Sequence, residues 1–205
     1  MKVAAVSQRI DHYPERNETR DALDQRLIAF LAVSGFIPVP VPNGLCNALS
    51  DDRCDQQALN GWLDAVNPQA YVLSGGNDIG QRGERDVTEG WLLDYARQHQ
   101  RPLLGICRGM QMMAHWTGTG LRPVQGHVGT RHRLTGEITG EVNSYHSFSL
   151  ATCPVDFDVL ARSEDGEIEA IRHQVLPWEG WMWHPEREEN FAARDVQRIK
   201  ALCNG

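Results

Sequence analysis

Cys107 lies at the centre of the most informative segment of the chain, residues 105–109, which read Gly-Ile-Cys-Arg-Gly. An apolar run precedes this segment and a helix-like run follows it. The pattern predicts a nucleophile elbow, a sharp strand-to-helix turn in which the flanking glycines relieve crowding. The helix N-terminus would lower the pKa of the thiol and offer N–H groups to an oxyanion. We interpret Cys107 as a nucleophile for acyl transfer; an ordinary buried thiol is the alternative.

A nucleophilic cysteine needs a general base, and the base needs a group that orients it. His184 and Glu186 supply both residue types at the end of an apolar, strand-like run. A carboxylate two residues beyond the imidazole is able to turn back to its second ring nitrogen, and Pro185 would stiffen that geometry. The remaining histidines outside residues 146–148 lack such a context, and we interpret them as structural. They are His12, His99, His115, His127, His132 and His173.

Strand-like and helix-like segments alternate through the first half of the chain, which predicts a parallel sheet with crossover helices. The expected strands are residues 2–7, 36–41, 70–74 and 102–106, and the expected helices are residues 19–34, 55–66 and 87–99. Pro38 and Pro40 cannot donate to a ladder, so their strand is expected to be short or to lie at an edge.

The second half of the chain reads as shorter strands followed by one helix. The expected strands are residues 137–142, 157–161, 167–173 and 178–183, with a tight turn at 163–166 and a helix at 191–202. Trp178, Trp181 and Trp183 are interpreted as core residues, with a base-stacking platform as the alternative.

Composition limits the class of protein. The chain has 205 residues, 41% of them hydrophobic, which fits a single domain over residues 1–205. With 20 Lys and Arg against 27 Asp and Glu, the net charge of −7 argues against broad nucleic-acid binding. No apolar run approaches the roughly 18 residues of a membrane span, and no secretory signal is evident. Five cysteines without CxxC spacing favour the cytoplasm, and neither a metal site nor a cofactor is predicted.

Three ordered motifs together resemble the class I glutamine amidotransferases and the related γ-glutamyl hydrolases. They are Gly75-Gly76 after a strand, residues 104–111 around the elbow, and the His-Pro-Glu of residues 184–186. The resemblance covers nearly the whole chain. It implies a flavodoxin-like α/β sandwich, with a mixed, mainly parallel central sheet flanked by helices. It also implies a triad in which Cys107 is the nucleophile, His184 the general base and acid, and Glu186 the group that orients His184.

The same resemblance implies roles for residues around the triad. The backbone N–H groups of Arg108 and of Gly76 in the Gly75-Gly76 loop would form the oxyanion hole. Gln111 would contact the glutamyl group, and the main chain of Ser147 and Phe148 would hold the amino-acid end of the substrate. Gly75 and Asn77 are expected to contact substrate from their loop, although Asn is also a common turn residue.

The elbow sequence Cys-Arg-Gly-Met-Gln is nearer to stand-alone γ-glutamyl hydrolases than to ammonia-delivering glutaminase domains. Residues 74–80, 163–166 and 177–187 are also similar to the γ-glutamyl-CDP-amidate hydrolase subgroup of capsule phosphoramidate biosynthesis. That subgroup cleaves its substrate to glutamate and cytidine diphosphoramidate. The alternatives are a glutaminase subunit that feeds ammonia to a separate synthetase, a hydrolase of another γ-glutamyl amine such as γ-glutamyl-GABA, and a non-catalytic binding domain.

Arg131 and Arg133, near Arg122 and His127, form a local concentration of cationic residues. We interpret Arg131 and Arg133 as contacts for the diphosphate of a nucleotide leaving group, with solvated surface charge as the alternative. The expected partner is a small-molecule γ-glutamyl amide, nucleotide-linked under the subgroup resemblance. Neither nucleic acid nor a membrane is expected, and a homodimer stays open.

Overall fold

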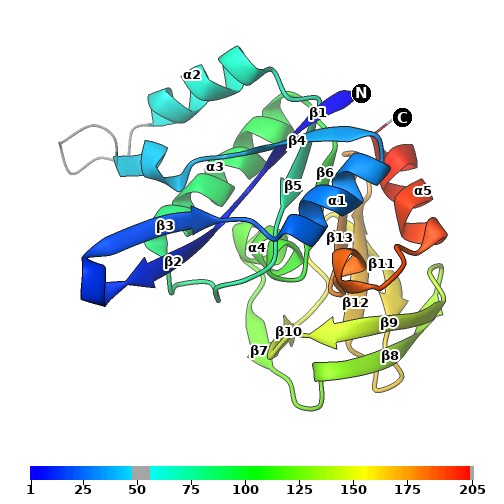
Figure 1. Cartoon of the computed structure of the whole chain (residues 1–205). Coiled ribbons are helices and arrows are strands. Elements are labelled where there is room, and N and C mark those ends of the chain that lie inside the picture. Colours follow the sequence, from blue (N-terminus) through cyan, green and yellow to red (C-terminus); the bar gives the residue numbers. More distant parts are fainter. Residues whose placement is uncertain (48–55, 204–205) are drawn as a thin grey trace.

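A computed structural model describes residues 1–47 and 56–203 of the chain (Figure 1). The strands are β1 (Lys2–Val6), β2 (Arg9–Tyr13), β3 (Glu18–Ala22), β4 (Phe36–Pro40), β5 (Ala70–Leu73), β6 (Leu103–Ile106), β7 (Leu121–Pro123), β8 (Val128–Gly136), β9 (Gly140–Tyr145), β10 (Phe148–Leu150), β11 (Phe157–Arg162), β12 (Ile168–His173) and β13 (Trp178–Trp181). The helices are α1 (Gln25–Val33), α2 (Gln56–Val66), α3 (Gly83–Gln98), α4 (Arg108–Trp116) and α5 (Ala193–Leu202).

A nine-stranded sheet organises the molecule, in the order β4-β1-β5-β6-β13-β12-β11-β8-β9. Its first five strands pair in parallel. From β13 to β9 every pairing is antiparallel. The expected mixed sheet flanked by helices is therefore confirmed. It places the C-terminal ends of β5, β6 and β13 side by side, where ligands bind in open α/β sheets.

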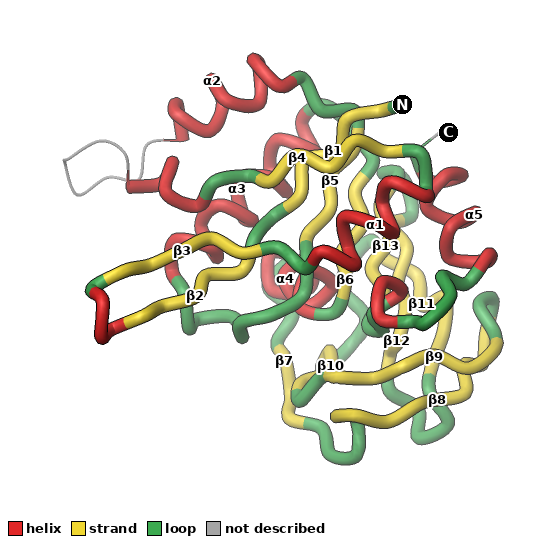
Figure 2. Tube along the Cα trace, in the orientation of Figure 1, coloured by secondary structure: helices red, strands yellow, loops and turns green. Residues whose placement is uncertain are grey.

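Two cores form because side chains of the parallel strands alternate between the faces of the sheet. In β1, Ala4 and Val6 join one core and Ala5 joins the other. The first core is completed by α1 and α5, and the second by α2, α3 and α4. Figure 2 shows α1 crossing in front of the strands and α3 lying behind them. Helices thus cover both faces of the parallel strands that carry the elbow.

The expected helix over residues 19–34 is wrong at its start. Residues 18–22 form β3, which pairs with β2 in a hairpin that projects from the molecule (Figure 1). The helix begins only at Gln25, after Asp24 caps it by accepting a hydrogen bond from the Arg26 N–H at 2.8 Å. The apolar spacing of Leu27, Phe30 and Leu31 predicted the helix correctly, because all three side chains are buried.

The expected strand over residues 137–142 is also wrong, because it crosses a turn. β8 ends at Gly136 and β9 begins at Gly140, with positive φ values of 122° and 111° that favour glycine. β7, β8 and β10 had no predicted counterpart. The helix expected at 87–99 begins earlier, at Gly83. The helix expected at 55–66 is confirmed over Gln56–Val66, and Asp55 lies outside the described residues.

Other local expectations are confirmed. β4, with its two prolines, lies at the edge of the large sheet. Residues 163–166 form a turn in which the Gly166 N–H donates to the Ser163 carbonyl at 3.0 Å. The three tryptophans of residues 178–183 are at most 1% exposed, which excludes the base-stacking alternative. Within residues 1–47 and 56–203, every helix is too short or too polar to cross a membrane.

Candidate active site

Cys107 forms a sharp turn between β6 and α4. Its φ of 51° and ψ of −104° lie in a sparsely populated region for a residue with a Cβ. The Cys107 N–H donates to the Trp181 carbonyl at 2.7 Å, and its carbonyl accepts from the Gln111 N–H at 3.1 Å. Strand pairing on one side and the helix on the other therefore hold the strained backbone in place. The elbow expected from the sequence is confirmed in its backbone geometry.

The glycines on either side of Cys107 are required by close packing. A Cβ at Gly109 would lie 2.2 Å from the Leu73 carbonyl oxygen. A Cβ at Gly105 would lie 2.6 Å from Met113 Sδ and 2.7 Å from the Gly109 carbonyl carbon. Real Cβ atoms do not approach neighbours this closely, so the expected relief of crowding is confirmed.

His184 directly faces Glu186. His184 Nδ1 lies 2.6 Å from Glu186 Oε1, and the two residues are only 2% and 3% exposed. Glu186 belongs to a 3₁₀ turn, Pro185–Arg187, that bends the carboxylate back toward the ring. Asn143 holds the same segment, because its side chain accepts from the His184 N–H at 3.0 Å and donates to the His184 carbonyl at 2.8 Å. Sequence reasoning missed Asn143, which carries no local signal.

The electrostatics of this pair favour a protonated imidazole. Burial lowers the pKa of His184, but the charge of Cys107, a hydrogen bond to Cys107 and the contact with Glu186 outweigh it. Together they raise the pKa of His184 to about 9. Cys107 and His184 are thus within hydrogen-bonding reach of each other. The arrangement suits a thiolate–imidazolium pair.

Gly75 and Gly76 lie in the loop that follows β5. A Cβ at Gly75 would lie 2.6 Å from His184 Cε1, so glycine leaves the room that the imidazole occupies. Gly76 has a φ of 93°, which a residue with a Cβ rarely adopts. The structure therefore brings this loop against the ring of His184, as the placement of both glycines in the site requires.

Arg85 from α3 fixes the orientation of that loop. Its Nη2 donates to the Ser74 and Gly75 carbonyls at 2.7 and 3.1 Å, and its Nη1 donates to the Gly76 carbonyl at 2.8 Å. All peptide bonds of the described residues are trans, so each carbonyl points opposite to the following N–H. The N–H groups of Gly75, Gly76 and Asn77 consequently point away from Arg85. Sequence reasoning missed Arg85.

A buried charge network supports Arg85 and Arg108. Arg85 pairs with Glu89 at 3.0 Å, and the Arg108 side chain pairs with Asp86 and Glu89. Burial lowers the pKa of Arg85 to about 10 and that of Arg108 to about 9, values that leave both guanidinium groups charged at neutral pH. Arg108 is also the first residue of α4, so its N–H has no partner within the helix. The spacing of Arg85 and Glu89 on one helix face was the available sequence signal.

The residues expected to hold the substrate differ in how they are placed. Gln111 is buried, and its Nε2 donates to the Phe148 carbonyl at 2.9 Å. Ser147 is exposed, and its carbonyl accepts from the Val124 N–H at 3.0 Å. The Asn77 side chain instead binds the backbone of Ile10, with Oδ1 at 2.8 Å from the N–H and Nδ2 at 3.1 Å from the carbonyl. The structure thus joins Gln111 to Phe148 and uses Asn77 to hold β2.

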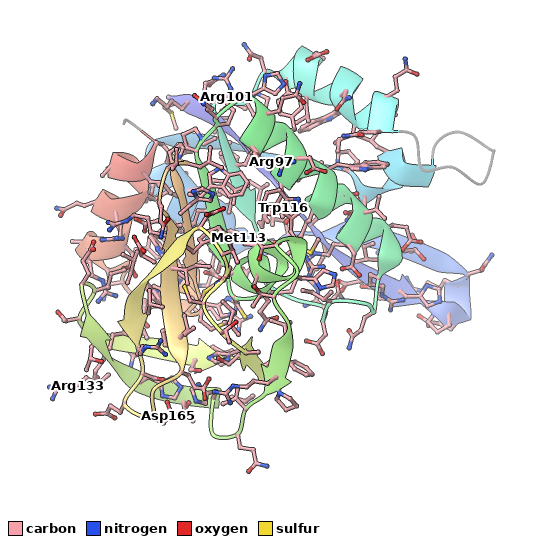
Figure 3. The ribbon with its side chains drawn as sticks, turned by 180° about the vertical axis from the view of Figure 1, so that it is seen from behind. Arg97, Arg101, Met113, Trp116, Arg133 and Asp165 are labelled. Carbon is pink, nitrogen blue, oxygen red and sulfur yellow. The ribbon has the colours of Figure 1, made fainter. Side chains whose placement is uncertain are left out.

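Arg131 and Arg133 lie on exposed positions of β8 and are not brought to the cavity beside His184. Arg131 pairs with Glu188 at 3.1 Å, and the Arg133 side chain reaches beyond the ribbon at the edge of the molecule (Figure 3). The cavity beside His184 is lined instead by the cationic side chains of Arg9 and Arg187. Sequence reasoning did not single out either residue.

One group of side chains has the residue types of a metal site. His127, His132, His146 and Glu169 each bring one ligand atom within 4.8 Å of the others. Two of these histidines, His127 and His132, were interpreted from the sequence as structural. The group lies in the antiparallel half of the sheet.

A mixed sheet with a cysteine elbow at the end of a central parallel strand, next to a buried His–Glu pair, defines a class I glutamine amidotransferase fold. The chain belongs to the glutamine amidotransferase class-I family, whose model matches residues 48–196. Members of this family act on amide bonds.

Individual relatives agree with this assignment. Over 138 residues, 64% of this chain and 68% of the relative, the sequence is 34% identical to γ-glutamyl-CDP-amidate hydrolase of Campylobacter jejuni. Over 155 residues, 69% of this chain and 79% of the relative, it is 29% identical to a glutamine-hydrolyzing GMP synthase subunit of Thermococcus kodakarensis. A crystal structure of a protein assigned to GMP synthase, from Thermoplasma acidophilum, covers 99% of this chain, with 94% of its own length matched, a TM-score of 0.71 and 20% identity. This last likeness supports the fold alone.

Proposed function

We propose that this protein is a cysteine-dependent hydrolase that cleaves a γ-glutamyl amide bond. The observation that carries the proposal is the strained Cys107 within hydrogen-bonding reach of His184, whose second ring nitrogen binds Glu186 at 2.6 Å. A nucleophile, a general base and an orienting carboxylate in this order are the groups that acyl transfer needs. In this proposal residues 1–205 form one catalytic domain that works in the cytoplasm, where its cysteines stay reduced.

The proposed reaction proceeds through a glutamyl thioester. The Cys107 thiolate attacks the γ-carbonyl carbon, and the N–H groups of Arg108 and Gly76 stabilise the resulting oxyanion. Losing one such donor typically lowers kcat by about 10²- to 10³-fold. Protonated His184 gives its proton to the departing nitrogen, and the neutral imidazole then removes a proton from the water that hydrolyses the thioester. Glutamate leaves last, and Cys107 is regenerated.

The proposed substrate is γ-glutamyl-CDP-amidate, cleaved to glutamate and cytidine diphosphoramidate for capsular polysaccharide modification. The similarity to the Campylobacter jejuni hydrolase supports this choice. Gln111, Ser147 and Phe148 would hold the glutamyl group. A diphosphate leaving group needs cationic contacts, for which Arg131 and Arg133 are one candidate pair.

A second candidate function is a glutaminase subunit that supplies ammonia to a separate synthetase. The similarity to glutamine-hydrolyzing GMP synthase subunits favours it. The two functions differ in what the isolated chain does: a hydrolase releases glutamate from its own substrate, whereas a glutaminase subunit depends on its partner chain.

The test is glutamate release by the purified chain from glutamine, γ-glutamyl-GABA and γ-glutamyl-CDP-amidate. Cys107→Ala is expected to abolish release, and Cys153→Ala, which removes a free cysteine outside the site, is the matched control. A strong preference for the nucleotide substrate supports the proposed hydrolase. Activity on glutamine alone supports the glutaminase reading, and release that survives Cys107→Ala refutes the nucleophile.

Two paired variants test where the nucleotide binds. The double variant Arg131→Ala/Arg133→Ala is expected to raise KM for γ-glutamyl-CDP-amidate while leaving hydrolysis of a simple γ-glutamyl amide unchanged. The double variant Arg9→Ala/Arg187→Ala removes the cations that line the cavity beside His184. Equal effects of the first variant on both substrates contradict the assignment, and a selective effect of the second transfers the role to Arg9 and Arg187.

A further inference from the structure

Four buried or half-buried side chains converge in the antiparallel half of the sheet, apart from the proposed catalytic residues. His127 precedes β8, His132 lies within β8, His146 follows β9, and Glu169 lies in β12. His127 Nδ1 is 3.2 Å from His146 Nε2, and Glu169 Oε1 is 3.5 Å from the first of these atoms and 3.4 Å from the second. A ring nitrogen of His132 lies within 4.8 Å of these atoms.

The outer ring nitrogens of two histidines are already occupied. His146 Nδ1 lies 3.0 Å from the Phe148 carbonyl oxygen, which only accepts, so this nitrogen carries the hydrogen. His127 Nε2 lies 2.8 Å from Asp165 Oδ2, a carboxylate that also accepts. The inner nitrogens of the neutral rings therefore present lone pairs, and these lone pairs face each other. An outer nitrogen held by a carboxylate or a carbonyl is the usual arrangement of a histidine that binds a metal.

The remaining polar atoms of the group also lack partners. Glu169 is fully buried, and neither of its carboxylate oxygens has a hydrogen-bond partner among the described residues. His132 Nε2 is buried without a partner in the same part of the structure. A buried carboxylate without a donor is costly, and buried polar groups are nearly always satisfied. One carboxylate and converging imidazole lone pairs together require a cation at their centre.

The separations fit one class of cation. A tetrahedral zinc ion with bonds of about 2.0–2.1 Å places its ligand atoms about 3.3–3.4 Å apart. The three separations of 3.2, 3.4 and 3.5 Å agree with that edge length. The geometry points to a zinc site formed by His127, His132, His146 and Glu169. Imidazole and carboxylate are ligands that Zn²⁺ binds well.

The site is structural in character. Four protein ligands fill a tetrahedral zinc ion and leave no position for water or substrate, unlike the three-ligand sites of zinc hydrolases. The ion would join β8, β9 and β12, of which β8 and β12 are separated in the sheet by β11. Metal binding would therefore stabilise the antiparallel half of the molecule.

Zinc would also order the segment expected to hold the substrate. The Phe148 carbonyl accepts both from His146 Nδ1 and from Gln111 Nε2, at 3.0 and 2.9 Å. His146 bound to zinc would fix the start of residues 146–148, and this carbonyl links the segment to α4. This consequence rests on the proposed function, whereas metal binding itself does not.

The test measures metal binding by the full chain. Zinc is removed with a chelator, and the apo protein is titrated with Zn²⁺ and with Co²⁺, whose visible absorption reports tetrahedral coordination. We expect one ion per chain, and a higher melting temperature for the zinc form than for the apo form. Glu169→Gln and His132→Gln are expected to weaken binding by about tenfold or more. His115→Gln, which removes an exposed histidine outside the group, is the control and should bind one ion.

A further variant covers the case in which a ligand substitution prevents folding. Asp165→Asn changes a carboxylate that is 54% exposed and touches only the outer nitrogen of His127, so the fold should tolerate it. Affinity should fall by about 10- to 100-fold. Apo protein that is folded by circular dichroism yet binds neither Zn²⁺ nor Co²⁺ overturns the inference. Equal binding by the wild type, Glu169→Gln and Asp165→Asn overturns it as well, and favours protonated imidazoles around Glu169. Neither result bears on γ-glutamyl hydrolysis, which is measured separately.

Discussion

Gly75→Ala offers a sharp test of how the proposed general base is positioned. Gly75 is not among the glycines with positive φ, so alanine is compatible with its backbone. The added Cβ would lie 2.6 Å from His184 Cε1. Because carbon atoms pack at about 3.5–4.0 Å, the ring must move by about 1 Å. A displacement of that size costs about 10²-fold in rate, or about 2.7 kcal/mol of transition-state stabilisation.

The assay compares kcat for glutamate release with the free energy of unfolding in urea. Gly61→Ala is the matched control, because a Cβ there meets nothing within 4 Å. We expect Gly75→Ala to lose about 10²-fold in kcat while remaining folded, and Gly61→Ala to keep full activity. A folded Gly75→Ala protein with unchanged kcat would refute the argument that the position of His184 against this loop sets the rate.

Three further predictions concern the elbow and its supports. Gly109→Ala should lower the free energy of unfolding by about 1–3 kcal/mol or more in urea, because the new Cβ would lie 2.2 Å from the Leu73 carbonyl oxygen. Cys107→Ala should lower the pKa of His184 from about 9, since it removes the thiolate that opposes burial; NMR titration of the imidazole measures it, and an unchanged value contradicts the coupling. Glu89→Gln leaves two buried guanidinium groups short of a counter-charge and should cost about 3–5 kcal/mol in urea unfolding; a loss below about 1 kcal/mol would show that the network is dispensable.

The catalytic elbow was predictable because its signal is local. Gly105, Cys107 and Gly109 lie within five residues, and each is required by the same strand-to-helix turn. His184 and Glu186 are likewise two residues apart. A short stretch of sequence therefore contains most of the geometry, and the resemblance to a family adds the relation between the two stretches.

The β2–β3 hairpin was not predictable in the same way. Residues 18–22 have no buried side chain, so the burial pattern that reveals a strand in sequence is absent. Only pairing with β2 identifies β3. The helix after it was predicted because Leu27 and Leu31 bury one face. Its start was misplaced because Thr19 and Asp24 are both residue types that begin helices.

The proposed zinc ligands show a different limit. His127, His132, His146 and Glu169 lie in or beside three strands, and they meet only because those strands fold into one sheet. Alternation along β8 would have placed His132 and the buried Leu134 on the same face. That signal needs the strand itself, which the sequence did not reveal. The ligand set therefore depends on topology that motif spacing cannot supply.

The two prolines of β4 determine which contacts the edge of the sheet permits. The Val41 N–H and the Gly35 carbonyl both bond to β1, so the odd-numbered residues of this segment face inward and the even-numbered ones face outward. Pro38 and Pro40 occupy outward positions and leave Phe36 as the outward N–H donor within β4. A strand from another chain would find too few donors to zip along this edge, which guards the protein against runaway sheet growth. Two copies that associate must meet through another surface.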